Sequence, residues 1–221
     1  MANLPLSSQI INLCAAVLLL VSFAMLSQRR VLSLVQLFAL QGAVLCLSTI
    51  TVAWTAGRSE LYVSAAVTLA LKVLLLPYIL HRLIRALNAR WETELLLNVP
   101  ATMLVGLLLV IFSFGLAQPI SQLAATVTRS TLGIAIAVVM LSFLMMITRR
   151  KAVTQVIGFL AMENGLFFAA TSATYGMPMV VELGVALDVL VAMLILGVFF
   201  FQIREQFDSL DLRNLEALKE E

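Results

Sequence analysis

The sequence predicts an all-α membrane protein with seven transmembrane helices. Of its 221 residues, 62% are hydrophobic and only 12% are charged, whereas about a quarter of the residues are charged in an ordinary soluble domain. The apolar residues form continuous stretches, and a helix needs about 20 such residues to cross a bilayer. Most of the basic residues lie in the short segments between these stretches. The bilayer is therefore the expected solvent of this chain.

The predicted spans follow one another along a single polytopic membrane domain, residues 1–221. Their approximate bounds are 8–26, 31–54, 59–80, 95–116, 131–147, 153–174 and 180–201. The first span has no basic residues before it and is followed by Gln28, Arg29 and Arg30. This is not the pattern of a cleaved signal peptide, so we expect the first span to remain in the protein.

The distribution of Lys and Arg predicts the orientation. The odd-numbered connections hold two or three basic residues each: Arg29 and Arg30, then Arg82, Arg85 and Arg90, then Arg149, Arg150 and Lys151. The second and fourth connections hold one each, Arg58 and Arg129, and the sixth holds none. Because cytoplasmic loops are enriched in Lys and Arg, we predict an outside N-terminus and a cytoplasmic tail, residues 204–221. Seven spans satisfy this parity.

Two pairs of similar segments suggest a duplication. VQLFALQGAVL in the second span aligns with VIGFLAMENGLFF in the sixth, and this places Gln41 opposite Glu163. ALKVLLLP in the third span aligns with ALDVLVAM in the seventh, which places Lys72 opposite Asp188. Spans one to three and five to seven would then form a parallel three-plus-one-plus-three repeat. Chance similarity is the alternative.

Charged residues inside the spans are the candidate functional residues. At about 1.5 Å per residue, Lys72, Glu163 and Asp188 lie about 18, 15 and 12 Å into their spans, near the middle of a hydrocarbon core of about 30 Å. Glu182 lies near the outer end of the seventh span. A charge at this depth costs at least about 2.5–3.5 kcal/mol. We interpret the four residues as a candidate proton or cation path. Two structural alternatives are an ion pair between Lys72 and an acid, and a hydrogen-bonded Glu163 with Asn164 or Gln155 nearby.

No pattern for a catalytic centre, metal or cofactor occurs in the sequence. Cys14 and Cys46 lie in apolar spans without a CxxC partner, and His81 is the single histidine. An Fe–S cluster or metal site is therefore not expected in this chain. No basic cluster with interleaved aromatic residues suggests nucleic acid, so membrane lipids are the expected surroundings.

Most of the chain, and most strongly residues 158–219, resembles the HyfE family, the component E subunits of group 4 membrane-bound NiFe-hydrogenases. The resemblance is carried by MENG at 162–165, VELGVALD at 181–188 and the tail FDSLDLRNLEALKEE at 207–221, and ALKVLLLP at 70–77 is similar to the third span of that family. The last three spans also resemble the NuoK and MrpC subunits of respiratory complex I and cation antiporters. Asp188 matches the later of two intramembrane Glu positions of NuoK-type subunits, and Glu163 lies about one turn after the earlier one.

This resemblance implies a non-catalytic subunit in the prokaryotic plasma (inner) membrane. It implies partners of two kinds, antiporter-like and hydrogenase-like subunits of one ion-translocating redox complex. A stand-alone secondary transporter with two three-helix repeats is a competing hypothesis, although spans one, two, five and six lack the prolines that would break paired helices at a midplane site. A purely structural membrane subunit is the third hypothesis.

Overall fold

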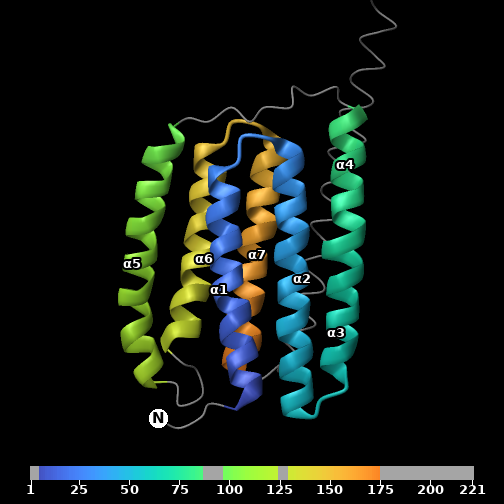
Figure 1. Ribbon diagram of the computed structural model, residues 1–221, viewed down its shortest axis with the longest axis vertical. Coiled ribbons are helices and arrows are strands. Elements are labelled where there is room, and N and C mark those ends of the chain that lie inside the picture. Colours follow the sequence, from blue (N-terminus) through green and yellow to red (C-terminus); the bar gives the residue numbers. More distant parts are fainter. Residues whose placement is uncertain (1–4, 87–96, 124–128, 175–221) are drawn as a thin grey trace, which may run out of the picture. The chain divides into compact units, whose positions relative to one another are not determined.

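The computed structural model describes residues 5–86, 97–123 and 129–174, and within these ranges all regular structure is helical (Figure 1). The helices are α1 (Leu6–Ser27), α2 (Val31–Ala56), α3 (Glu60–Thr68), η1 (Leu69–Leu75), α4 (Leu76–Ala86), α5 (Val99–Leu123), α6 (Arg129–Thr148) and α7 (Ala152–Thr174). The segment η1 is a π-helix that joins α3 to α4 without a break. We call α3, η1 and α4 together the third span.

Within the described residues, six helical segments are long and apolar enough to cross a membrane. They are Leu6–Ser27, Val31–Ala56, Glu60–Arg82, Val99–Pro119, Thr131–Thr148 and Val153–Ser172. These segments coincide with the first six predicted spans, and the all-helical prediction is confirmed for the described part of the chain. The seventh predicted span, 180–201, lies outside the described residues, as does the tail, 204–221. Seven spans, the orientation and the repeat remain predictions.

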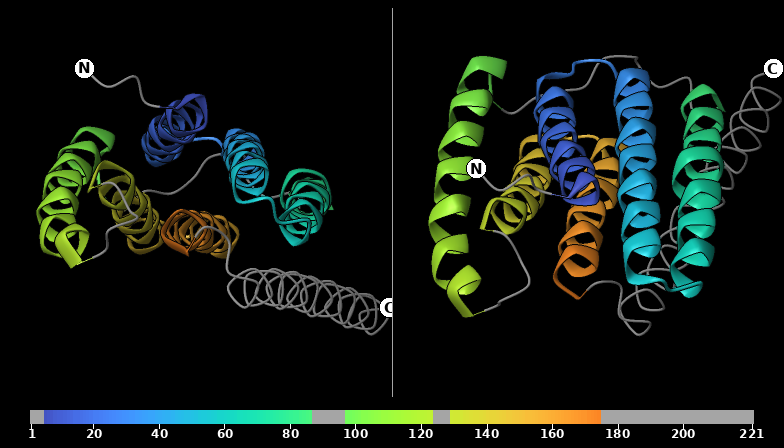
Figure 2. Two further views of the ribbon diagram at one scale, coloured as in Figure 1. Left: turned by 90° about the horizontal axis from the view of Figure 1, so that it is seen from below. Right: turned by 60° about the horizontal axis from the view of Figure 1, so that its bottom comes forward.

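The described helices form two facing rows (Figure 2). One row contains α1, α2 and the third span, and the other contains α5, α6 and α7. Across the rows α1 packs on α6 and α2 packs on α7, while α5 packs mainly on α6 and the third span on α2. In the predicted repeat α1 corresponds to α6 and α2 to α7, so the two pairs of corresponding helices are neighbours.

The core lies between α1, α2, α6 and α7. One cluster of buried apolar residues there consists of Ala15, Leu18, Leu45, Ala135, Val138, Phe167 and Phe168. Glycine allows the close approach of α7 to α6: a Cβ atom added at Gly165 would lie 2.9 Å from Cγ1 of Val138 and 3.2 Å from the backbone nitrogen of Val139. Small residues at such contacts are typical of helices that pack in lipid.

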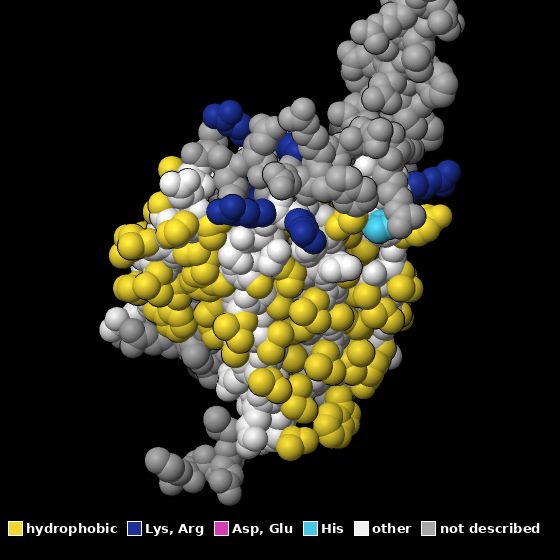
Figure 3. Space-filling view, turned by 45° about the horizontal axis from the view of Figure 1, so that its top comes forward, with side chains coloured by type: hydrophobic (Ala, Val, Ile, Leu, Met, Phe, Trp, Pro, Cys, Tyr) yellow, Lys and Arg dark blue, Asp and Glu magenta, His cyan; other side chains and the backbone are white. Residues whose placement is uncertain are grey.

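Basic residues gather at one end of the helices, and apolar side chains cover the sides (Figure 3). Consecutive spans run in opposite directions (Figure 1), so the α1–α2 and α6–α7 connections share this end. These connections contain Arg29, Arg30, Arg150 and Lys151. At the opposite end α2 stops at Gly57, which has a left-handed backbone with φ of 64°, a conformation that glycine adopts without steric cost.

Candidate functional site

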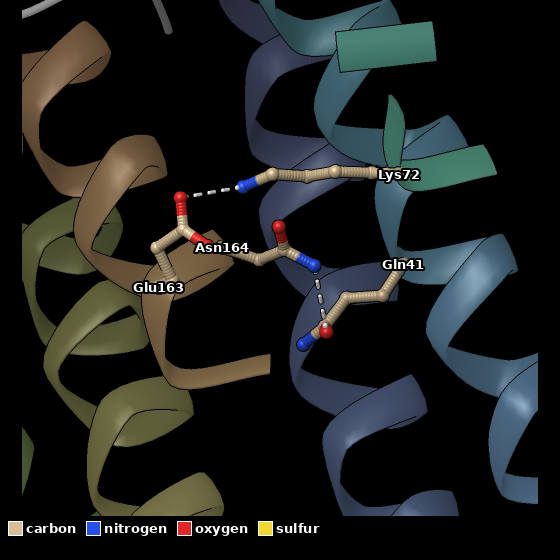
Figure 4. Close-up of polar contacts among 4 residues, drawn as sticks. All are labelled: Gln41, Lys72, Glu163 and Asn164. Atoms are coloured by element: carbon tan, nitrogen blue, oxygen red, sulfur yellow. Dashed lines mark hydrogen bonds and ion pairs between the residues drawn. The ribbon is translucent and has the colours of Figure 1, made fainter. Parts of the chain in front are cut away.

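The structure brings together two of the four residues that the sequence singles out. The ammonium nitrogen Nζ of Lys72 donates to Oε1 of Glu163 at 3.1 Å. The two residues are 1% and 3% exposed, respectively. Their contact joins the third span to α7 in the space between the packed helices (Figure 4). Glu182 and Asp188 lie outside the described residues, so their part in the site stays a prediction.

The backbone around Lys72 is unusual. Lys72 lies at the centre of the π-helix η1, whereas the residues before and after η1 are α-helical. π-Helical turns are rare and often occur at functional sites. The extra residue in such a turn rotates the following residues by about 100° relative to a continuous α-helix. The π-turn therefore sets which side chains of the third span face α2 and α7.

Gly42 of α2 gives Lys72 its room. A Cβ atom added at Gly42 would lie 3.1 Å from Cβ of Lys72 and 3.5 Å from its backbone carbonyl carbon. Any larger side chain would push the third span away from α2. With glycine at this place, the lysine chain extends past α2 and reaches Glu163 on α7 (Figure 4).

A chain of uncharged hydrogen bonds lies beside the ion pair. Nδ2 of Asn164 donates to Oε1 of Gln41 at 3.1 Å, and Nε2 of Gln41 donates to Oγ of Ser22 at 3.1 Å. The Ser22 hydroxyl donates to the carbonyl oxygen of Leu18 at 2.8 Å. These bonds link α7, α2 and α1, and the three polar side chains are buried. In the sequence Gln41 stood out only through the repeat alignment, although an amide in the middle of an apolar span is a signal for a buried polar contact of this kind.

The aromatic ring of Phe167 borders the lysine. Lys72 Nζ lies 5.7 Å from the ring centroid, within the range of cation–π attraction. The surroundings are therefore apolar on one side and hydrogen-bonding on the other. In such a medium each charge alone would be costly, so removing either Lys72 or Glu163 would destabilise the folded protein.

This arrangement can bind a proton at Glu163 and can change the hydrogen-bond acceptor of Lys72. The Glu163 carboxylate can take up a proton, and this removes the attraction that holds the Lys72 ammonium. Within the described residues no group of three or more His, Cys, Asp and Glu side chains is arranged to hold a metal ion. Cys46 instead donates its thiol to the carbonyl oxygen of Ala65 at 3.3 Å.

Arg149 is a buried charged residue outside the Lys72–Glu163 pair, and its position in the sequence indicated only a basic connection residue. It is 1% exposed, and its Nη2 donates to the carbonyl oxygens of Met25 and Leu26 at 3.2 and 3.1 Å. Carbonyls in the last turn of a helix lack intrahelical donors, so the guanidinium caps α1. Gln155 donates to the carbonyl oxygen of Arg149 at 2.9 Å. Burial lowers the pKa of Arg149 to about 10, which leaves it charged at neutral pH.

Comparison with known proteins finds relatives along the whole chain. The uncharacterized protein Rv0085 of Mycobacterium tuberculosis is 33% identical over 214 residues, which are 96% of this chain and 97% of that protein. Hydrogenase-4 component E of Escherichia coli K12 is 26% identical over 212 residues, 96% of this chain and 98% of that protein. Hydrogenase-4 component E of Shigella flexneri matches to the same extent.

No protein-family model matches the chain, and no solved structure matches it. The distant match to component E supports the resemblance that the motifs of the last third suggested. Identity of 33% along nearly the full length of both chains is sufficient to place this chain and Rv0085 in one family. The chain therefore belongs to the same family as Rv0085, and hydrogenase-4 component E is its distant full-length homologue.

Proposed function

We propose that this protein is a non-catalytic membrane subunit of a hydrogenase-like complex and that it contributes the Lys72–Glu163 pair to a path for protons or sodium ions. The observation that carries the proposal is this buried pair in the membrane-spanning part of a full-length relative of hydrogenase-4 component E. Redox chemistry then belongs to the partner subunits, and this chain serves ion movement.

Energetics favour a functional role for the pair. Burying two charges costs several kcal/mol per ion, and well-packed apolar residues are often as stable as a buried ion pair or more stable. Intramembrane charges are therefore commonly found on ion pathways. The polar chain from Asn164 through Gln41 to Ser22 supplies further hydrogen-bonding groups next to the pair. A closed apolar interface would need none of these groups.

In the proposal the path continues into the seventh predicted span. Asp188 is the next acid at mid-depth, and Glu182 is the acid near the outer mouth. The tail and the basic connections face the cytoplasm of a prokaryotic cell, and the complex lies in its plasma (inner) membrane. Its other membrane subunits are antiporter-like, as the likeness of the last three spans to NuoK and MrpC implies.

The direct contact between Lys72 and Glu163 also favours a second candidate, a purely structural subunit. In this case the pair ties the third span to α7 and carries no ion. The two candidates differ in what Glu163→Gln should do. A path residue can be neutralised with assembly intact and ion movement lost, whereas a structural pair loses both together.

The first test is a mild-detergent purification of the tagged full chain from its native membranes, with mass spectrometry of the co-purifying proteins. We expect hydrogenase-like and antiporter-like subunits. A chain that purifies alone, as a small homo-oligomer, contradicts the proposal and favours a stand-alone transporter.

The second test compares Glu163→Gln and Asp188→Asn with Glu60→Gln, a matched change at an exposed end of the third span. Assembly is followed on blue-native gels, and ion movement per turnover is measured in inverted vesicles. The two mid-depth variants should assemble normally and lose ion movement, while Glu60→Gln keeps both. Loss of assembly together with ion movement would favour the structural candidate.

A further inference from the structure

The amide group of Asn164 is hydrogen-bonded only on its nitrogen side among the described residues. Asn164 is 0% exposed, and its nitrogen Nδ2 is bound to Gln41. Its oxygen Oδ1 has no hydrogen-bond partner among the described residues. A buried acceptor without a donor costs about 1–3 kcal/mol, and such atoms in a folded protein call for an explanation.

The position of this oxygen supplies the explanation. Asn164 directly follows Glu163 on α7, and in Figure 4 its amide oxygen points toward the Lys72 side chain while its nitrogen points toward Gln41. The ammonium group has three N–H donors and no acceptor. The oxygen is thus the member of the amide that an ammonium can approach favourably.

We propose that Oδ1 of Asn164 is a second acceptor for the Lys72 ammonium, used when Glu163 is protonated. One proton adds to the Glu163 carboxylate and gives the neutral acid, and Lys72 keeps its proton. The bond from Nζ to Oε1 of Glu163 is exchanged for a bond from Nζ to Oδ1 of Asn164. The net charge of the pair changes from zero to plus one, and no covalent bond other than the new O–H changes.

Gln41 is the positioning residue in this exchange. Its Oε1 accepts from Nδ2 of Asn164 and its Nε2 is itself held by Ser22. This fixes the amide with its oxygen on the lysine side, because a flip would turn two N–H donors toward the ammonium. The exchange rests on the proposed ion path only for the source of the proton, and the place of Lys72 can be measured without any ion movement.

The test is a set of variants of the full chain expressed in its native membranes. Glu163→Leu removes the first acceptor, Asn164→Leu removes the second, and the double variant removes both. Assembled protein is quantified on blue-native gels. Each single variant gives a fraction of the parental amount of assembled protein. We expect the double variant to assemble at least about five-fold less than the product of these two fractions, because residues that share a partner are energetically coupled. Single effects that simply multiply would overturn the proposal.

Ser113→Ala in α5 serves as the control partner for each single variant, since this buried hydroxyl bonds within its own helix and should combine without coupling. If Glu163→Leu fails to assemble, the same cycle is measured on Glu163→Gln, which keeps an uncharged acceptor. In the cycle that combines Glu163→Gln with Asn164→Leu, the coupling should have the same sign and be smaller. Its absence would overturn the proposal.

A structure of the Glu163→Leu or Glu163→Gln variant at side-chain resolution gives a direct readout. Lys72 Nζ should lie within about 3.2 Å of Oδ1 of Asn164, and adding Gln41→Leu should release this contact. A lysine that turns away from Asn164 contradicts the inference. These readouts do not depend on which subunits co-purify, so failure here and failure of the proposed function are separate results.

Discussion

Replacing Lys72 with methionine should destabilise the protein by about 3–4 kcal/mol. The variant leaves the Glu163 carboxylate buried without its 3.1 Å ammonium partner, and breaking a buried pair in this way costs about 3–5 kcal/mol. The carboxylate can limit the loss by taking up a proton. From an ordinary carboxyl pKa of about 4.3 to about pH 7, this neutralisation costs about 3.7 kcal/mol. The upper end of the range of about 3–5 kcal/mol is therefore limited to about 3.7 kcal/mol.

The double variant Lys72→Met/Glu163→Leu should recover most of this loss. It replaces both charges by apolar groups of similar length, and such replacements of buried pairs are often neutral or stabilising. Ion movement should be absent in the double variant although the protein is stable. A stable protein without ion movement would show that the charged pair is needed for ion movement and not for stability.

The assay is the thermal unfolding midpoint of the purified full chain or its complex in one detergent at one pH. A loss of about 3–4 kcal/mol corresponds to roughly 6–16 °C for a chain of this length. Arg82→Met, at an exposed position of the same span, is the control and should shift stability by less than about 0.5 kcal/mol. If Lys72→Met and the double variant unfold at the same temperature as the parent, the reasoning about a buried ion pair is refuted.

Three further predictions concern single contacts, each read from the unfolding midpoint. Gly42→Ala places a methyl group 3.1 Å from the Cβ atom of the paired lysine and should lower the midpoint; Gly115→Ala, which meets nothing within 4 Å, should raise it, because alanine favours a helix by up to about 1 kcal/mol over glycine. Arg149→Met removes two bonds to carbonyls at the end of α1 and should cost about 1–3 kcal/mol, so parental stability would argue against the cap. Ser48→Ala deletes a buried hydroxyl that has no hydrogen-bond partner among the described residues and should be neutral or stabilising. Ser113→Ala deletes a bonded hydroxyl and should be destabilising, and the reverse order would contradict both assignments.

The helices themselves could be predicted from sequence because the bilayer leaves a chain few choices. Backbone N–H and C=O groups find no water in lipid, so an apolar stretch of sufficient length must satisfy them internally as a helix. Six segments of the described chain follow this rule. The same cost argument identified Lys72 and Glu163 as residues that need a partner or a function.

An ion pair between Lys72 and an acid was one alternative that the sequence offered, but which acid it joins and the partners of the neighbouring amides could not be predicted. The repeat alignment placed Lys72 opposite Asp188 and Gln41 opposite Glu163, and Asn164 or Gln155 seemed available to Glu163. In the structure Glu163 receives Lys72, Asn164 binds Gln41, and Gln155 binds the carbonyl oxygen of Arg149. The first two contacts join residues 91 and 123 positions apart, and such separations along the sequence give no information about separation in space.

The order of residues along the chain shows which residues are polar within each helix and how far they lie from its ends. The rotation of each helix and its distance from its neighbours are visible only once the helices are packed. The π-turn η1 rotates the part of the third span that carries Lys72, and Gly42 and Gly165 set the close approach of α2 to the third span and of α7 to α6. Because a side chain reaches only the groups within its own length, these rotations and spacings select Glu163 as the partner of Lys72 and direct Asn164 toward Gln41.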